Sequence, residues 1–164
     1  MILTIDGVAG AGKTTLAAFI SLEFQDRFSI QVVHMDDLYD GWDEPLGAGL
    51  AQKLIQIAHA HREQRPFHGR RFNWQSAARG ESFVISPVDL LILEGVGSGQ
   101  RVIREFVETK IWIELKPIIG LARVLERDGV QIESQMMDFL DQQEKHFLEE
   151  GTREAANFYL NGEH

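Results

Sequence analysis

The chain has 164 residues, no cysteine, 25 acidic and 16 basic residues, and a formal net charge of −9 at pH 7. Its length predicts one domain over residues 1–164, and its 44% hydrophobic and 25% charged residues exclude fibrous and disordered classes. The negative charge argues against nucleic-acid binding, and the lack of cysteine excludes disulfides, thiolate zinc sites and cysteine nucleophiles.

The first apolar run, residues 2–6, leads into the spacing of a Walker A motif, Gly7-x-x-x-x-Gly12-Lys13-Thr14. Glycines let the backbone turn so that N–H groups face phosphate oxygens, and the helix expected over residues 13–25 adds its positive dipole end. We expect Lys13 to reach the β- and γ-phosphates of a triphosphate and Thr14 to bind Mg²⁺. The residues expected to hold the nucleotide are Gly7, Ala9, Gly10, Ala11, Gly12, Lys13, Thr14 and Thr15.

The second predicted strand, residues 30–34, is followed by the neighbouring acids Asp36 and Asp37. Because the carboxyl ends of parallel strands open onto one edge of a sheet, these carboxylates are expected near the γ-phosphate. Phosphoryl transfer to an alcohol requires an acceptor for the hydroxyl proton, and Asp36 is the predicted base. An aspartate before a turn is more often a helix N-cap, and that is the role we expect for Asp37.

Residues 65–88 follow a helix predicted over residues 47–64 and have no clean period. Their arginines and aromatic residues indicate an inserted, substrate-facing segment, which we place over about residues 36–80. Two interpretations stay open, a grip on an anionic or aromatic substrate or a basic surface. Trp42 and Trp74 either stack on a base or sugar or, as is commoner, belong to the core. The arginines and aromatic residues concerned are Arg62, Arg65, Arg70, Arg71, Arg79, Phe67, Phe72 and Trp74.

The third predicted strand, residues 90–94, has four apolar residues and then Glu94, the layout of a Walker B strand with glutamate in place of aspartate. We therefore expect Glu94 to hold Mg²⁺ through water. The glycine-rich residues 95–99 lack the G-x-G-x-x-G spacing of a dinucleotide site, which excludes NAD. They indicate a tight active-site turn, followed by a helix over residues 99–108.

The remaining predicted elements are two strands and two helices, at residues 111–115, 158–160, 117–128 and 134–149. Arg123 and Arg127 lie four residues apart on one helix face, so both guanidinium groups can act on one transferred phosphoryl group. We expect them in a lid over about residues 123–135. Without the Walker motifs, two solvated arginines near a helix end would be an equal alternative.

Other side chains have no expected chemical role. Trp112 lies inside a predicted strand and is expected in the core. The six histidines have no metal-binding spacing, so no function is assigned to them. Apolar residues at helical spacing near the carboxyl end indicate a packing surface. They are Met136, Phe139, Leu140, Phe147 and Leu148.

Strand-length apolar runs alternate with segments of helical period along the whole chain. This alternation predicts an α/β fold, a three-layer αβα sandwich with a parallel sheet between helices. The sequence has no basic leader and no apolar run long enough to span a membrane. With the absence of cysteine, this predicts a cytoplasmic protein without membrane contact, and a homo-oligomer is left open.

Taken in order, the motifs resemble the series found in the uridine kinase family. They are the Walker A loop and residues 34–45, 72–74, 93–95 and 123–128. The resemblance implies a P-loop kinase fold with a five-stranded parallel sheet in the order 2-3-1-4-5. It also implies phosphorylation of the 5′-hydroxyl of uridine or cytidine by ATP and Mg²⁺, with Asp36 as proton acceptor.

The same resemblance implies an acceptor site. Asp43 falls near the family's acidic contact to the ribose, and residues 72–74 resemble its tyrosine-aspartate-aromatic segment, with Asn73 where the family usually has aspartate. Arg123 and Arg127 match its lid arginines. The residues expected at the small-molecule acceptor are Asp36, Tyr39, Asp43, Arg71, Asn73 and Trp74.

Two other functions fit the motifs. One is a different small-molecule P-loop kinase, of the shikimate, gluconate or adenylylsulfate type, and the other is an ATP-binding regulator without catalysis. A GTPase switch is disfavoured because the chain has neither an Asn-Lys-x-Asp motif nor Asp-x-x-Gly after the third strand. The expectation of ATP rather than GTP rests on the resemblance.

Overall fold

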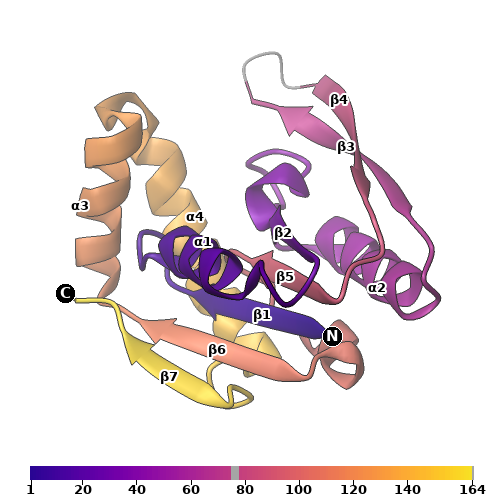
Figure 1. Ribbon diagram of the computed structural model, residues 1–164. Helices are drawn as coiled ribbons and strands as arrows, with labels where there is room; N and C mark the ends of the chain where they lie inside the picture. Colours follow the sequence, from indigo (N-terminus) through magenta and orange to yellow (C-terminus); the bar gives the residue numbers. More distant parts are fainter. Residues whose placement is uncertain (75–77, 164) are drawn as a thin grey trace.

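The computed structural model describes residues 1–74 and 78–163, and the side chain of Arg79, with any role for it, lies outside this description. Its main sheet has five strands in the order β2-β5-β1-β6-β7, all pairs parallel (Figure 1). Numbered among themselves, these strands have the order 2-3-1-4-5, which confirms the prediction. The strands are β1 (Ile2–Gly7), β2 (Ile30–His34), β5 (Leu90–Glu94), β6 (Thr109–Glu114) and β7 (Phe158–Asn161).

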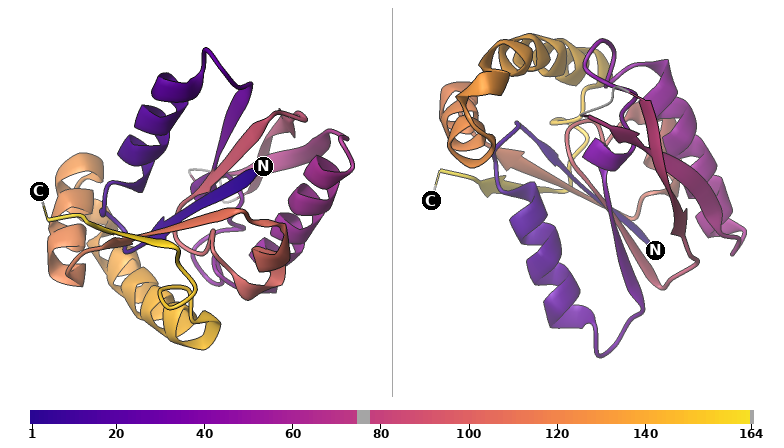
Figure 2. Two further views of the ribbon diagram at one scale, coloured as in Figure 1. Left: turned by 60° about the horizontal axis from the view of Figure 1, so that its bottom comes forward. Right: turned by 90° about the horizontal axis from the view of Figure 1, so that it is seen from above.

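Helices cover both faces of the sheet, α1 on one and α2 and α4 on the other (Figure 2). The α-helices are α1 (Lys13–Phe24), α2 (Ala48–Arg62), α3 (Pro117–Asp128) and α4 (Glu133–Glu150). Short 3-10 helices are η1 (Met35–Asp37), η2 (Arg101–Phe106) and η3 (Val130–Ile132). Within the ranges described, no helix is both long enough and apolar enough to cross a membrane.

The alternation of side chains along β5 builds the two cores. Leu91 and Leu93 belong to the cluster beneath α2, whereas Leu90 and Ile92 belong to the cluster beneath α1. A strand buried on both faces reads as a continuous apolar run, as this one does. Trp112 on β6 is 3% exposed, as predicted for a core residue.

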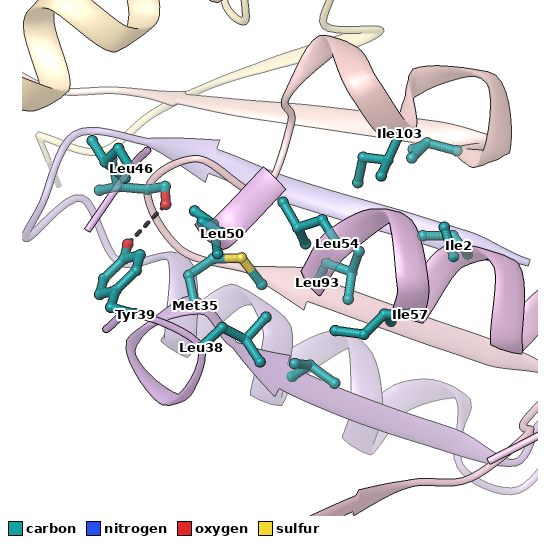
Figure 3. Close-up of a cluster of buried hydrophobic side chains, with 14 of the residues drawn as sticks. Ile2, Met35, Leu38, Tyr39, Leu46, Leu50, Leu54, Ile57, Leu93 and Ile103 are labelled. Carbon is teal, nitrogen blue, oxygen red and sulfur yellow. Dashed lines mark hydrogen bonds between the residues drawn. The ribbon is translucent and has the colours of Figure 1, made fainter. Parts of the chain in front are cut away.

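The larger core lies between α2 and the sheet (Figure 3). Leu50, Leu54 and Ile57, three and four residues apart on α2, are each at most 2% exposed. Burying each such side chain contributes about 1.5–3 kcal/mol to folding. Although α2 lies within the segment predicted to face the substrate, its apolar side is used to fix the sheet.

The register of the parallel strands brings three chain segments to one edge. His34 at the end of β2 and Ile5 near the end of β1 both align with Glu94 at the end of β5. Gly7 aligns with Ile113 on β6. The predicted Walker A loop, the acidic segment after β2 and Glu94 therefore share the carboxyl edge of the sheet.

The segment that had no clean period forms an antiparallel hairpin, β3 (Phe67–Asn73) and β4 (Ala78–Ile85). The register shifts between Arg70 and Phe72, so an irregularity interrupts the two-residue alternation that would have marked a strand. Gly69 leaves room for the Phe83 ring, whose Cζ would be 2.5 Å from an added Cβ.

The helix predicted over residues 99–108 is wrong. This segment contains η2, a six-residue 3-10 helix that ends at Phe106. Ile103 and Phe106 are both buried and stand three residues apart. That spacing places them on one side of a helix with three residues per turn, so a 3-10 helix buries both without a longer α-helix.

Candidate active site

The loop between β1 and α1 has the backbone shape of a phosphate-binding turn. Gly10 and Gly12 have φ values of +78° and +92°, which favour glycine. Among the described residues no side chain caps the start of α1, so its first-turn N–H groups are left to face a ligand. Three amides of residues 7–12 are already used, since Gly7 donates to Asp6 Oδ1 at 2.8 Å, Ala9 to Gln143 Oε1 at 3.1 Å and Ala11 to the Val8 carbonyl at 3.1 Å.

Two helices press on this loop from outside. A Cβ added to Gly120 of α3 would lie 2.1 Å from the Ala9 carbonyl oxygen, and one added to Gly10 would lie 2.4 Å from the Gly120 carbonyl oxygen. From α4, Gln143 is 2% exposed and accepts the Ala9 N–H. The loop is therefore held between α3 and α4, and a side chain at Gly10 or Gly120 would clash with the backbone.

Lys13 lies inside the loop and is 7% exposed. Its ammonium group donates to the carbonyl oxygens of Gly7 and Val8, each at 2.8 Å. Burial lowers the pKa of Lys13, and the nearby carboxylates of Asp6 and Glu94 oppose that shift. A buried ammonium that faces this loop is a strong electrostatic partner for an anionic phosphate.

Glu94, Thr14 and His34 form a polar cluster at the carboxyl edge. The Thr14 hydroxyl donates to Glu94 Oε1 at 2.9 Å, and His34 Nδ1 is hydrogen-bonded to the same oxygen. This bond raises the pKa of His34. Thr14 and Glu94 offer the oxygen ligands that Mg²⁺ prefers, and phosphate oxygens and water would complete its shell, so these residues fit the ion.

A cavity of about 980 Å³ extends from the Walker A loop along this edge. Asp36 opens into it together with Lys13 and Glu94. Although solvent reaches Asp36, burial of its carboxyl group and the charge of Glu94 raise its pKa. A carboxylate with a raised pKa in a cavity is suited to accept a proton.

Aromatic and apolar side chains line the end of the cavity beyond Asp36. The Trp42 ring meets those of Trp74 and Phe139 edge-on, with centroids 5.0 Å and 6.4 Å away. Tyr39 is 3% exposed and donates from its hydroxyl to the Val96 carbonyl at 2.8 Å, the dashed line in Figure 3. The side chains at this end are Tyr39, Trp42, Pro45, Trp74, Val96, Val124, Ile132, Met136 and Phe139.

Both predicted lid arginines line the cavity. Arg123 donates to the carbonyl oxygens of Gly10 and Gly162, at 3.3 Å and 2.7 Å, and so connects α3 with the phosphate loop and the end of β7. Arg127 forms two hydrogen bonds to the Asp128 carboxylate, at 2.7 Å and 2.6 Å. Of this pair, Arg127 alone is exposed.

Three residues expected at the acceptor do not line the cavity. Arg71 instead pairs with Asp37, Nε to Oδ1, at 3.0 Å. Asp43 and Asn73 are exposed and lie outside the cavity lining. Asp37 lies within η1 and bridges to Arg71, so its predicted role as an N-cap is wrong, because η1 begins at Met35 rather than after Asp37.

Sequence reasoning missed three side chains near the site. Gln143 interrupts the apolar stripe of α4, seven residues after Met136, and a polar residue on a buried stripe was the available signal. His34 begins the motif at residues 34–45 and stands at the end of a strand, but no role was assigned to it. Asp6, directly before the Walker A glycine, accepts three backbone N–H groups.

Comparisons with known proteins identify similar enzymes. No protein-family profile matches the chain. It is 26% identical over 149 residues to a uridine kinase from Lactobacillus helveticus, which covers 78% of this chain and 67% of that protein. A cytidylate kinase from Methanococcoides burtonii is 24% identical over 143 residues, 87% of this chain and 72% of that protein.

Solved structures agree on the architecture. A possible uridine kinase from Bacillus stearothermophilus matches with a TM-score of 0.71 at 18% identity, over 98% of this chain and 88% of that chain. A shikimate kinase from Bacteroides thetaiotaomicron matches with a TM-score of 0.55 at 16% identity, over 99% and 86%. The predicted P-loop kinase fold is confirmed, and the chain is a divergent relative of uridine kinase-like P-loop kinases.

Proposed function

We propose that the protein is an ATP- and Mg²⁺-dependent kinase that transfers the γ-phosphate to a hydroxyl of a small metabolite, with a nucleoside such as uridine as the best single acceptor. One observation carries this proposal. The Walker A residues, Glu94 and Asp36 open into the same cavity, whose far end is aromatic. A nucleotide tail and an alcohol can thus meet beside a carboxylate.

The chemistry follows from the positions of these side chains. Asp36 would accept the proton of the attacking hydroxyl, and Lys13 would leave its two loop carbonyls to meet the phosphates. Thr14 and Glu94 would hold Mg²⁺, which when bound neutralises charge on the phosphate oxygens. Arg127 would stabilise charge on the transferred group as residues 123–135 close as a lid.

The charges beyond Asp36 favour a neutral acceptor over an anionic one. Among the described residues, Arg127 in the cavity lining is already paired with Asp128, and Arg71, three residues before Trp74, is paired with Asp37. An anionic acceptor would have to displace these carboxylates and approach Asp36 as well. This supports a nucleoside, whose base can stack on Trp42 and Trp74, over shikimate, gluconate, adenylylsulfate or a nucleoside monophosphate.

An acceptor screen tests the proposal. Purified protein with Mg²⁺ and a non-hydrolysable ATP analogue is heated with nucleosides, sugars, organic acids and CMP, because a ligand of the folded state raises the melting temperature. Hits are then assayed for ADP formation with ATP and with GTP. Turnover of a neutral nucleoside supports the proposal, whereas preference for CMP or an acid refutes the acceptor class. Tight ATP binding without turnover of any acceptor would favour the non-catalytic regulator.

A further inference from the structure

The loop of residues 95–99, called the 95–99 loop below, contributes Val96 to the cavity lining but takes no step in the chemistry above, and hydrogen bonds hold it along its length. From the middle and one end of the loop, Gly97 and Gly99 donate their N–H groups to the Asp6 carboxylate, to Oδ1 at 3.1 Å and to Oδ2 at 2.8 Å. At the other end, the Val96 carbonyl accepts the Tyr39 hydroxyl at 2.8 Å. The 95–99 loop therefore lies between the start of the phosphate loop and Tyr39 of the substrate-facing segment, which is called the acceptor segment below.

Asp6, on β1, forms hydrogen bonds to the phosphate loop as well as to the 95–99 loop. Its Oδ1 also accepts the N–H of Gly7, the first Walker A glycine, at 2.8 Å. One buried carboxylate, 1% exposed, thus joins the amides of the phosphate loop and of the 95–99 loop. Three backbone N–H groups from two separate stretches of chain are therefore held by one side chain.

The glycines of the 95–99 loop allow this close approach. A Cβ on Gly99 would lie 2.7 Å from Thr152 Cγ2 and 3.2 Å from Asp6 Oδ2. Gly97 has a φ of +83°, and a Cβ there would lie 3.1 Å from methyl groups of Leu46 and Leu50. Glycine at position 99 thus permits the close approach to Asp6, whereas glycine at position 97 is favoured by its positive φ and by the leucines packed against it.

Burying a carboxyl group costs free energy unless hydrogen bonds compensate for the lost water. Burial raises the pKa of Asp6, although its hydrogen bonds to Gly99 and Gly7 and the charge of Lys13 oppose that shift. A carboxyl group whose pKa is higher in the folded state contributes stability at low pH that is lost as the pH rises through that value. The three hydrogen bonds of Asp6 to residues of two separate loops offer a reason for the presence of this buried carboxyl group.

We propose, on the basis of the kinase function above, that Asp6 is a positioning residue that couples the phosphate loop to the acceptor segment through the 95–99 loop and Tyr39. When Asp6 holds the loop, the Val96 carbonyl fixes Tyr39, three residues after the predicted base Asp36. The phosphate loop, the base and the aromatic wall then keep one geometry.

The variant Asp6→Asn tests this with little change in shape. An amide can still accept from Gly7 and Gly97, but its NH₂ group then faces the Gly99 N–H, donor against donor. Asp89→Asn is the matched control, because Asp89 also accepts a backbone N–H, that of Ser29 at 2.8 Å, at the opposite end of β5. If Asp6→Asn does not fold, Gly99→Ala disturbs the same contact with the carboxylate in place.

The first measurement is amide hydrogen exchange of the protein without ligands. We expect Asp6→Asn to speed exchange in the 95–99 loop about tenfold or more, the value for about 1.4 kcal/mol, while Asp89→Asn leaves it unchanged. Unchanged exchange in Asp6→Asn overturns the proposal whether or not the protein proves to be a kinase. This readout therefore separates failure of the coupling from failure of the proposed function.

The second measurement is a double-mutant cycle with Tyr39→Phe, which removes the hydroxyl bound to Val96. If both residues act through the 95–99 loop, Asp6→Asn should increase the acceptor KM by a smaller factor in the Tyr39→Phe background than in the wild type. We expect the two factors to differ at least about threefold. Its effect on the KM for ATP, exerted through Gly7, should be equal in both backgrounds. Additive effects on the acceptor KM would leave Asp6 with a structural role only and overturn the coupling.

Discussion

The end of the cavity beside the Walker A loop, here called the phosphate end, is held mainly by backbone contacts. The end beyond Asp36, here called the acceptor end, is lined by side chains from several separate segments. At the phosphate end, glycines, first-turn amides and the carbonyls bound by Lys13 all belong to one continuous stretch of chain. At the acceptor end, Trp42, Trp74 and Phe139 come from a loop, the hairpin and α4.

This difference between the two ends indicates where the amino-acid sequence can vary without loss of the site. A backbone turn that must face phosphates tolerates few sequences, because it needs glycine at particular φ values. An aromatic wall requires only ring area from several elements, so its members can be exchanged and its specificity altered. The proposed kinase thus joins a constrained nucleotide site to an adaptable acceptor site.

The largest expected effect is at the phosphate end. Lys13→Ala should lower kcat/KM by about a thousandfold or more, because it removes the cation that faces the developing charge on the phosphate. The assay is acceptor-dependent ADP formation. Lys145→Ala, on the exposed side of α4, is the control and should leave activity unchanged. Near-normal turnover by Lys13→Ala would contradict the role proposed for Lys13 and its loop in catalysis.

Asp36→Asn should reduce kcat by about 10²- to 10³-fold while ATP binding stays intact, because a general base acts only on the acceptor proton. Isothermal titration with an ATP analogue and steady-state kinetics separate the two quantities. The neighbouring Asp37→Asn, which breaks the ion pair with Arg71, should have a much smaller effect. Equal losses in the two variants would contradict the assignment of the base.

Gly120→Ala tests how tightly the phosphate loop is held. The new Cβ would lie 2.1 Å from the Ala9 carbonyl oxygen, so we expect ATP affinity and stability each to fall by about 1–3 kcal/mol. Titration calorimetry and thermal unfolding measure these changes. Ala122→Ser also adds one heavy atom to α3, at an exposed position, and should be neutral. If Gly120→Ala changes neither ATP affinity nor stability, the phosphate loop can move to make room for the added methyl group.

A pair of variants compares the two ends directly. Trp74→Ala removes part of the acceptor wall and should raise the acceptor KM about fivefold to tenfold, with the KM for ATP unchanged. Phe19→Ala removes a ring that lines the cavity from α1, and it should raise the KM for ATP and leave the acceptor KM unchanged. Steady-state kinetics with each substrate varied in turn tests this split. If both variants raise both KM values equally, the cavity is not divided as proposed.

The smallest effect concerns pH. The pKa of Asp36 is raised by burial and by Glu94, and Arg127 lowers it through its positive charge. Since the base must be ionised, activity should fall as the pH drops through this pKa, and Arg127→Gln should move that acid limb upward by less than about one pH unit. The pH profile of kcat/KM measures the shift. Arg153→Gln, paired with Glu114 elsewhere, should leave the limb in place.

Local sequence determined the phosphate end and the sheet. The Walker A spacing, the apolar run that ends at Glu94 and the acid that follows β2 are each contained in a short stretch, so their place at strand ends followed from the fold class. The order of the five parallel strands also agreed with the resemblance on which it was predicted.

Only the tertiary structure decided the rest. The register shift between Arg70 and Phe72 interrupts the alternation by which the hairpin could have been predicted, and Arg71 was expected at the acceptor but forms an ion pair with Asp37. Gln143 reaches Ala9 across 134 residues of sequence, and Asp6 meets Gly99 across 93. Contacts of this kind depend on packing between distant elements, which no local period or spacing encodes, whereas a glycine turn around phosphate is encoded within a few adjacent residues.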